Sequence, residues 1–172
     1  MMNNRRLYPN LARAAALAVA LQGVGVLAAD ETFTTRSMTP ETALKAAQAA
    51  LAKCRADGFQ VSVAIVDRSG LVQVVLRDRF AGAHSPDTAV NKAWTAVSFR
   101  TNTSDLMKST RPDQPSGGIR NLPRVIALGG GMMIQAGGSI IAGIGVSGAP
   151  GGDADDTCAK AGIKAVADSL EF

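Results

Sequence analysis

The sequence predicts one α+β domain, built on a mainly antiparallel sheet of about five strands flanked by α-helices. The first reason is the order of the expected elements, which is helix, hairpin, helices, strands, helix, because a hairpin pairs its two strands antiparallel. The second reason is size, since 172 residues, 47% of them hydrophobic, suffice for one hydrophobic core and little more. A doubly wound sheet and a two-domain enzyme are therefore not expected.

The first half of the chain is predicted to contain two longer helices with a β-hairpin between them. Thr39 followed by Pro40, and Ser85 followed by Pro86, are typical of an N-cap and the first helical position. Between these helices, two strand-like apolar runs lie on either side of a turn at 68–70, which predicts a hairpin over 60–77. The expected elements are a helix over 40–57, strands over 61–67 and 71–76, a helix over 86–100 and a short helix over 104–109.

The second half is predicted to contain a loop, short strands and a final helix. Prolines and glycines between residues 110 and 123 predict an ordered loop. Short apolar runs then alternate with glycine clusters, and the first turn of the last helix carries Asp155 and Asp156, which suit its positive N-terminus. The expected elements are strands over 125–128, 132–135 and 139–147 and a helix over 153–169.

The first 28 residues have the pattern of a secretory signal peptide. Arg5, Arg6 and Arg13 stand without acidic neighbours, and a short apolar run ends in small residues. The run is shorter than the roughly 18 apolar residues of a transmembrane helix. We therefore expect a signal peptide over 1–28, a mature domain over 29–172, a periplasmic or secreted location and no stable membrane anchor after cleavage. The arginine pair leaves twin-arginine export open beside the general route.

Cleavage of this signal would change the charge of the protein. The whole chain has 18 basic and 14 acidic residues, and removal of the three arginines leaves 15 basic residues against the same 14 acids. A net charge of +1 gives no support for a basic nucleic-acid face, so no nucleic-acid partner is expected.

Export would also place the chain's two cysteines, Cys54 and Cys158, in an oxidising compartment. Both lie on predicted helices, so a disulfide requires the first and last helices to be neighbours. Two buried thiols are the alternative.

Three familiar catalytic patterns are absent or incomplete. Gly143, Gly145 and Gly148 fit G-x-G-x-x-G, but only 24 residues follow, too few for the second strand of a dinucleotide-binding unit. Close backbone approach and a tight strand-to-helix loop explain these glycines better. Ser147 does not fit a nucleophile elbow because Ala149 stands where the second glycine is needed. One histidine and two distant cysteines cannot form a closed zinc site.

The single histidine, His84, stands on the loop before the second long helix. A lone histidine is usually structural, but on such a loop it also suits a metal complex that brings its own ligands, as haem does. The candidate cations for haem propionates are Arg77, Arg79, Lys92 and Arg100, and the candidates for an apolar slot are Phe80, Trp94, Met132 and Met133. Each of these residues also has an ordinary core or surface interpretation.

Several ordered segments together resemble the GlcG/HbpS family of haem-binding proteins, which is related to the C-terminal domain of PduO-type corrinoid proteins. Within about residues 38–170 the segments are VAIVD at 63–67 with the turn glycine Gly70, KAWTA at 92–96, GGG at 129–131, GIGVSGAP at 143–150, and the run from Asp153 and Asp156 into CAKAG at 158–162. The resemblance implies an antiparallel sheet flanked by helices, self-association into dimers or larger assemblies, and binding or breakdown of haem outside the cytoplasm. It makes His84 the candidate axial ligand of haem iron, beside Arg77, Lys92 and Met132 as further haem-binding candidates.

The expected function is that of an exported haem-binding protein that sequesters, delivers or protects against haem. Binding is preferred to enzymatic turnover, because no residue identifies the reductase site that haem degradation needs. Two alternatives stay open: an enzyme or enzyme accessory that binds a small organic acid through the backbone amides of a ligand loop, and an oligomeric structural or chaperone module without a small ligand. The ligand-loop residues are Gly129, Gly130, Gly131, Gly145 and Ser147.

Overall fold

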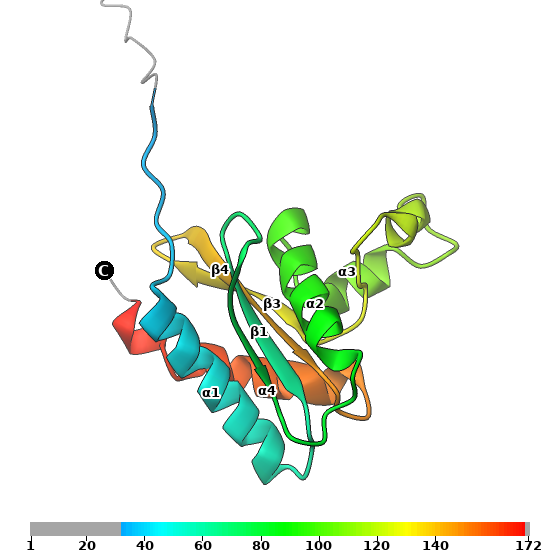
Figure 1. Ribbon diagram of the computed structural model, residues 1–172. Helices are drawn as coiled ribbons and strands as arrows, with labels where there is room; N and C mark the ends of the chain where they lie inside the picture. Colours follow the sequence, from blue (N-terminus) through cyan, green and yellow to red (C-terminus); the bar gives the residue numbers. More distant parts are fainter. Residues whose placement is uncertain (1–31, 171–172) are drawn as a thin grey trace, which may run out of the picture. The chain divides into compact units, whose positions relative to one another are not determined.

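Helices α1 (Pro40–Ala56) and α2 (Ser85–Phe99) begin where the sequence predicts them. The Thr39 hydroxyl caps α1 by accepting a hydrogen bond from the Thr42 amide, and Pro86 occupies the first turn of α2. The computed structural model describes residues 32–170 (Figure 1), so the signal peptide predicted over 1–28 lies outside the described residues.

The remaining elements give one sheet of four antiparallel strands, in the order β2-β1-β4-β3. Strand β1 pairs with β4 along its full length, from Ser62 opposite Ser147 to Asp67 opposite Ala142. The predicted α+β class is confirmed, but the sheet has four strands where about five were expected. The elements are β1 (Ser62–Asp67), β2 (Val72–Arg77), α3 (Thr103–Ser109), a 3₁₀ turn (Gly117–Asn121), β3 (Gly131–Ala136), β4 (Ser139–Ser147), α4 (Gly152–Lys164) and a second 3₁₀ turn (Ala167–Ser169).

The strand predicted over 125–128 is wrong. Residues 125–127 carry no regular structure, although Val125 and Ala127 are buried in a small cluster with Leu106 of α3. The amide of Ile126 donates to the Thr95 hydroxyl on α2, at 3.0 Å, instead of to a neighbouring strand. The apolar pattern of this segment therefore reflects burial against helices and not membership of the sheet. The last predicted helix is also shorter, because α4 ends at Lys164.

Helices cover both faces of the sheet. On one face α1 and α4 pack against each other, and Ile65 of β1 shares their core with Ile144 of β4. On the other face α2 lies along the strands, where Ala93 and Val97 form a second cluster with Val66. Figure 1 shows α1 and α4 on the side of the strands away from α2. Ile65 and Val66 belong to different cores because successive strand residues point to opposite faces.

A disulfide joins α1 to α4. Cys54 and Cys158 are both fully buried, their Cα atoms are 5.5 Å apart, and 104 residues separate them in sequence. The first and last helices are therefore neighbours, which is the condition that the sequence left open. In the chain-entropy description, closing so long a loop stabilises the folded state by about 4 to 5 kcal/mol.

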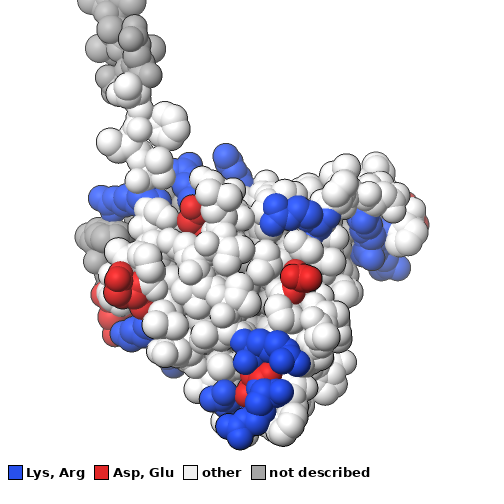
Figure 2. All heavy atoms as spheres, in the orientation of Figure 1, with Lys and Arg blue, Asp and Glu red and all other residues white. Residues whose placement is uncertain are grey.

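Charged side chains do not gather into one continuous basic patch on the face drawn in Figure 2, where lysines and arginines are interspersed with acids and uncharged residues. Within residues 32–170, no helix combines the length and the apolar composition that crossing a membrane requires.

Two glycines of the G-x-G-x-x-G pattern lie inside β4, directly beneath α2. A Cβ on Gly143 would lie 2.8 Å from the carbonyl oxygen of Ala93, and a Cβ on Gly145 would overlap the carbonyl oxygen of Ala89. The glycines therefore allow the helix backbone to lie directly on the strand, as close approach predicts.

Replacing Gly145 by Ala should lower the free energy of unfolding by about 1 to 3 kcal/mol, because the added methyl group pushes α2 away from the sheet. Chemical denaturation followed by circular dichroism measures the change. The matched control is Gly118→Ala, where an added Cβ meets nothing within 4 Å. Equal stability of the two variants would contradict the proposed close packing.

Candidate functional site

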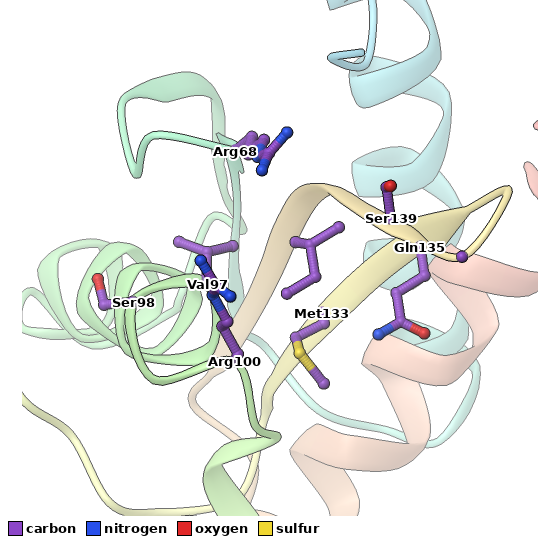
Figure 3. A pocket seen from close by; sticks show the side chains of 9 residues that line it. Arg68, Val97, Ser98, Arg100, Met133, Gln135 and Ser139 are labelled. Atoms are coloured by element: carbon purple, nitrogen blue, oxygen red, sulfur yellow. The ribbon is translucent and has the colours of Figure 1, made fainter. Parts of the chain in front are cut away.

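Two cavities lie along α2 among the described residues, one at each end of the helix. The arginine cavity, of about 470 Å³, lies at the C-terminal end between Arg68 and Arg100 (Figure 3). The histidine cavity, of about 700 Å³, lies at the N-terminal end and is lined by His84 and Lys92. Ser139 lines the first and Ser147 the second, so the two cavities are at opposite ends of β4.

The histidine cavity has one apolar wall and one polar wall. Met107 of α3 contributes to the apolar wall together with Ile126 and Leu128 of the segment before β3. The polar wall includes the loop from β4 into α4, at 147–152. A cavity of this volume falls in the range that holds cofactor-sized ligands.

The loop that carries His84 is fixed at both ends. At its start, the buried carboxylate of Asp78 accepts two hydrogen bonds from the Arg55 guanidinium, at 2.7 and 2.9 Å. At its end, the Ser85 hydroxyl lies 2.8 Å from that of Ser62 on β1. His84 itself therefore projects from a backbone that the sheet and α1 hold in place.

The imidazole of His84 is exposed and free to bind a ligand. Its ring packs over Gly82, where a Cβ would lie 2.7 Å from the imidazole Cε1. Within residues 32–170 the ring makes no hydrogen bond or ion pair. Both features leave a ring nitrogen available at the mouth of the cavity.

The Arg55 guanidinium lowers the pKa of Asp78 from 3.8 to about 2, mainly by hydrogen bonding and against the opposing effect of burial. A carboxyl group whose pKa is lowered by folding stabilises the folded state above its unfolded pKa. That stabilisation is lost as the pH falls through the folded pKa.

Replacing Asp78 by Asn should therefore lower the free energy of unfolding by about 1 to 2 kcal/mol at pH 6, a moderate value because Arg55 is half exposed. The difference from the unmodified protein should shrink as the pH falls from about 4 towards 2. Urea unfolding at a series of pH values measures it. A difference that stays constant down to pH 2 would contradict the ion pair.

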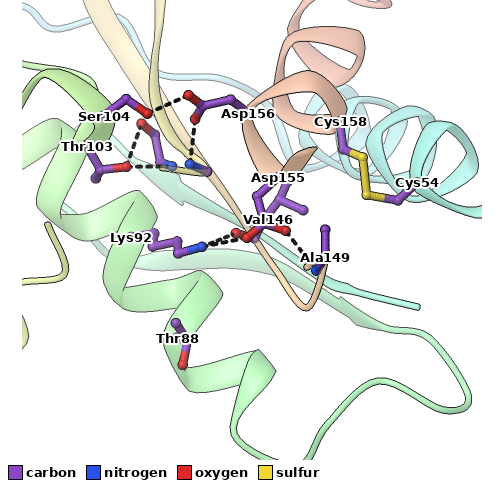
Figure 4. Close-up of polar contacts among 12 residues, drawn as sticks. Cys54, Thr88, Lys92, Thr103, Ser104, Val146, Ala149, Asp155, Asp156 and Cys158 are labelled. Atoms are coloured by element: carbon purple, nitrogen blue, oxygen red, sulfur yellow. Dashed lines mark hydrogen bonds and ion pairs between the residues drawn. A yellow bond between two sulfur atoms is a disulfide. The ribbon is translucent and has the colours of Figure 1, made fainter. Parts of the chain in front are cut away.

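A buried ion pair closes the floor of the histidine cavity (Figure 4). The ammonium of Lys92 lies 2.7 Å from one carboxylate oxygen of Asp155 and donates to the carbonyl oxygen of Val146 at 2.9 Å. The other oxygen of Asp155 accepts from the Ala149 amide at 3.1 Å. Burial raises the pKa of Asp155, and Lys92 opposes this change. Lys92 is therefore already neutralised by the chain itself.

The glycine loop is held by side chains of the same chain. The amide of Gly130 donates to Asp156, whose other oxygen accepts from the Ser104 hydroxyl. The amide of Gly131 donates to the Thr103 hydroxyl at 2.9 Å. The amides of Gly130 and Gly131 are therefore not available to the anion pocket expected for organic-acid binding, and that alternative stays a prediction for the other amides of the two loops.

The structure brings together only some of the predicted site residues. His84, Lys92, Gly129 and Ser147 line one cavity, while Gly145 packs beneath α2. The other predicted residues lie elsewhere. Met132 is buried in the core with α1 and α4, Arg77 donates to the carbonyl oxygen of Ala81, and Phe80 is 80% exposed. Trp94 lies beneath the Arg124 guanidinium, and Met133 and Arg100 line the arginine cavity.

Sequence reasoning missed Asp155 and Asp156 as part of the site. The sequence indicates helix-terminal charges, yet both carboxylates are buried. Asp155 accepts a hydrogen bond from Lys92 of α2, and Asp156 accepts one from the amide of Gly130 in the glycine loop. Lys92 offered a signal, because a lysine among apolar helical residues needs a buried acid, but the sequence does not say which acid supplies it.

Replacing Lys92 by Met should lower the free energy of unfolding by about 3 kcal/mol or more, because Asp155 then stays buried without its counter-charge. Lys92→Met combined with Asp155→Asn should recover part of the loss, since an amide oxygen can still accept from Ala149. Urea unfolding at neutral pH measures both variants.

The matched control is Lys53→Met, which removes a surface pair with Asp57 and should cost less than about 1 kcal/mol. Equal losses for Lys53→Met and Lys92→Met would contradict the importance of the buried pair.

The fold and the site define an α+β domain with a ligand-sized cavity at the junction of α2, the glycine loop and α4. Residues 38–164 match the family described as "Haem degrading protein HbpS-like", and the chain belongs to this family. The resemblance to the GlcG/HbpS family is thus confirmed, and membership places the protein among haem-related proteins.

Two curated relatives come from Citrobacter freundii. The chain is 32% identical over 114 residues to an uncharacterized 15.0 kDa protein, a match that covers 65% of this chain and 80% of that protein. It is 35% identical over 98 residues to the corrinoid adenosyltransferase PduO, covering 55% of this chain and 29% of PduO. The chain therefore corresponds to less than a third of PduO.

Two solved structures share the fold. A double mutant of Streptomyces reticuli HbpS superposes with a TM-score of 0.74 at 38% identity, covering 93% of this chain and 97% of that chain. The PduOC:Heme complex superposes with a TM-score of 0.71 at 29% identity, covering 75% of this chain and 94% of that chain.

Proposed function

We propose that the protein is an exported haem-binding protein in which His84 is the axial ligand of the haem iron. The observation that carries the proposal is the unengaged imidazole of His84 at the edge of a cavity of about 700 Å³ with an apolar wall. Membership of the HbpS-like family and the structural likeness to a haem complex of PduOC support the choice of ligand.

The residues of the histidine cavity fit a haem group in part. A neutral imidazole is a common axial ligand, and Met107, Ile126 and Leu128 offer apolar contacts for the porphyrin. Haem would supply a redox-active iron at this position. Lys92 does not suit a propionate, because Asp155 already neutralises it, and Arg77 does not line the cavity. Among the described lining residues, Lys92 is the one lysine or arginine, so no cation of the cavity is free to pair with a propionate.

Binding, and not breakdown, is the activity that we propose. The role is to sequester, deliver or protect against haem in a periplasmic or secreted location. A buried disulfide supports such a location, since disulfides persist in oxidising compartments. Self-association into dimers or larger assemblies, expected from the resemblance, stays a prediction; exposed Leu71 and Val72 at the edge strand are consistent with it.

Haem titration followed by absorption spectroscopy tests the proposal. The wild-type protein should shift the Soret band at micromolar concentration, and His84→Ala should lose the shift, because the chain has no second histidine to replace the ligand. Asp87→Ala, an exposed substitution on α2 outside the cavity lining, is the matched control and should bind normally.

Two results would count against the proposal. Failure of the wild-type protein to shift the haem spectrum would remove haem as the ligand. An unchanged spectrum in His84→Ala would assign the iron to another residue and overturn the role of His84.

A further inference from the structure

We propose that the arginine cavity binds a small organic carboxylate, at the opposite end of α2 and β4 from the histidine cavity. Arg68, in the turn between β1 and β2, and Arg100, at the end of α2, line the same space of about 470 Å³. Figure 3 shows their side chains around a space that Met133, Gln135 and Ser139 border on other sides.

In the part of the chain that the structure describes, neither arginine of this cavity has a partner. Within residues 32–170, the guanidinium groups of Arg68 and Arg100 make no ion pair or side-chain hydrogen bond. Most other arginines of the domain are engaged: those with a bonded or stacked guanidinium are Arg55, Arg77, Arg111, Arg120 and Arg124. Two unpaired guanidinium groups at one cavity create a positive potential that an anion would neutralise.

The backbone of Arg100 has the left-handed conformation of a helix C-cap, which bears on the choice of test variant. Its φ of 51° lies in the left-handed region, where the end of a helix normally favours glycine. The other non-glycine residue with positive φ among the described residues is Arg124, whose guanidinium stacks 4.6 Å from the Trp94 ring centroid. Arg100 has the same backbone conformation, but within residues 32–170 its guanidinium has no partner.

The remaining lining matches a carboxylate with a short apolar body. Among residues 32–170, no acidic residue lines the cavity, and the carboxylate of the neighbouring Asp67 is already bonded to the turn amides of Ser69 and Leu71. Gln135 and two serines add uncharged donors. Val97, Met133 and Ile140 supply the smaller, apolar part of the lining, which a carbon skeleton can contact and inorganic phosphate cannot. Arginine is suited to such a ligand because its planar guanidinium matches a carboxylate in a bidentate arrangement.

Thermal unfolding and calorimetric titration with acetate, lactate, malonate and succinate test the proposal, against sodium chloride at equal ionic strength. At least one carboxylate should raise the unfolding midpoint more than the salt does. Arg68→Gln and Arg100→Gln should each weaken its binding by at least about tenfold. Arg79→Gln removes an exposed arginine outside the cavity and should leave the affinity unchanged.

The variant Arg100→Gly distinguishes an effect on carboxylate binding from an effect on the stability of the fold. Glycine relieves the left-handed backbone, so the midpoint without ligand should stay the same or rise while carboxylate binding is lost. Carboxylate binding that survives in Arg100→Gly or Arg68→Gln would overturn the site. The site would also be overturned if no carboxylate raised the unfolding midpoint of the wild-type protein more than sodium chloride does. If inorganic phosphate bound as tightly as the best carboxylate, the preference for an organic ligand would be overturned.

The same variants keep this proposal distinct from the haem proposal. Haem titration of Arg68→Gln and Arg100→Gln should give the wild-type Soret shift, and His84→Ala should retain carboxylate binding. Loss of the haem spectrum in the arginine variants would place the haem propionates in this cavity and overturn a separate carboxylate site.

Discussion

The ion pair between Lys92 and Asp155 is the interaction on which the rest of the site depends. It joins α2 to α4 across the end of β4, where the carbonyl oxygen of Val146 accepts a further hydrogen bond from the same ammonium. The side chains are only 4% and 5% exposed, so each charge relies on the other in place of water. A chain that buried either group without the other would leave an uncompensated charge, which costs far more than the pair itself contributes. Burial of both charges is therefore favourable only when α2 and α4 meet at this edge of the sheet.

The acids at the start of α4 also decide what kind of ligand the neighbouring cavity can take. Asp155 and Asp156 accept hydrogen bonds from the amides of Ala149 and Gly130, so these two amides are not available to an external anion. A ligand that enters the histidine cavity meets one apolar wall and the imidazole of His84, which has no partner within residues 32–170. This combination suits a metal complex with a large apolar surface.

Helix α2 thus separates two chemically different environments. Its N-terminal end carries His84 beside an apolar wall, and its C-terminal end carries Arg100 beside Arg68. The glycines of β4 let the helix lie directly on the sheet, so its position relative to both cavities is set by backbone contact and not by adjustable side chains. Rigid support of this kind is what a binding site at either end requires, because loosely held residues bind less well.

The sequence by itself determined the fold class, the positions of both long helices and the hairpin, since capping residues, prolines and strand-like apolar runs act locally. The resemblance of its ordered segments to a haem-binding family also made His84 the candidate iron ligand, which stays a prediction. The predicted strand at 125–128 was wrong because an apolar run indicates burial, but it does not indicate whether the segment packs against a strand or against a helix.

Only the tertiary structure decided which charges meet. It paired Lys92 with Asp155 and placed Met132 in the core on the far side of the sheet. It also brought Arg68 and Arg100 to one cavity, where neither has a partner within residues 32–170. The physical reason is that these contacts join residues far apart in sequence. Local patterns set each element's conformation, but long-range packing sets which side chains share a cavity.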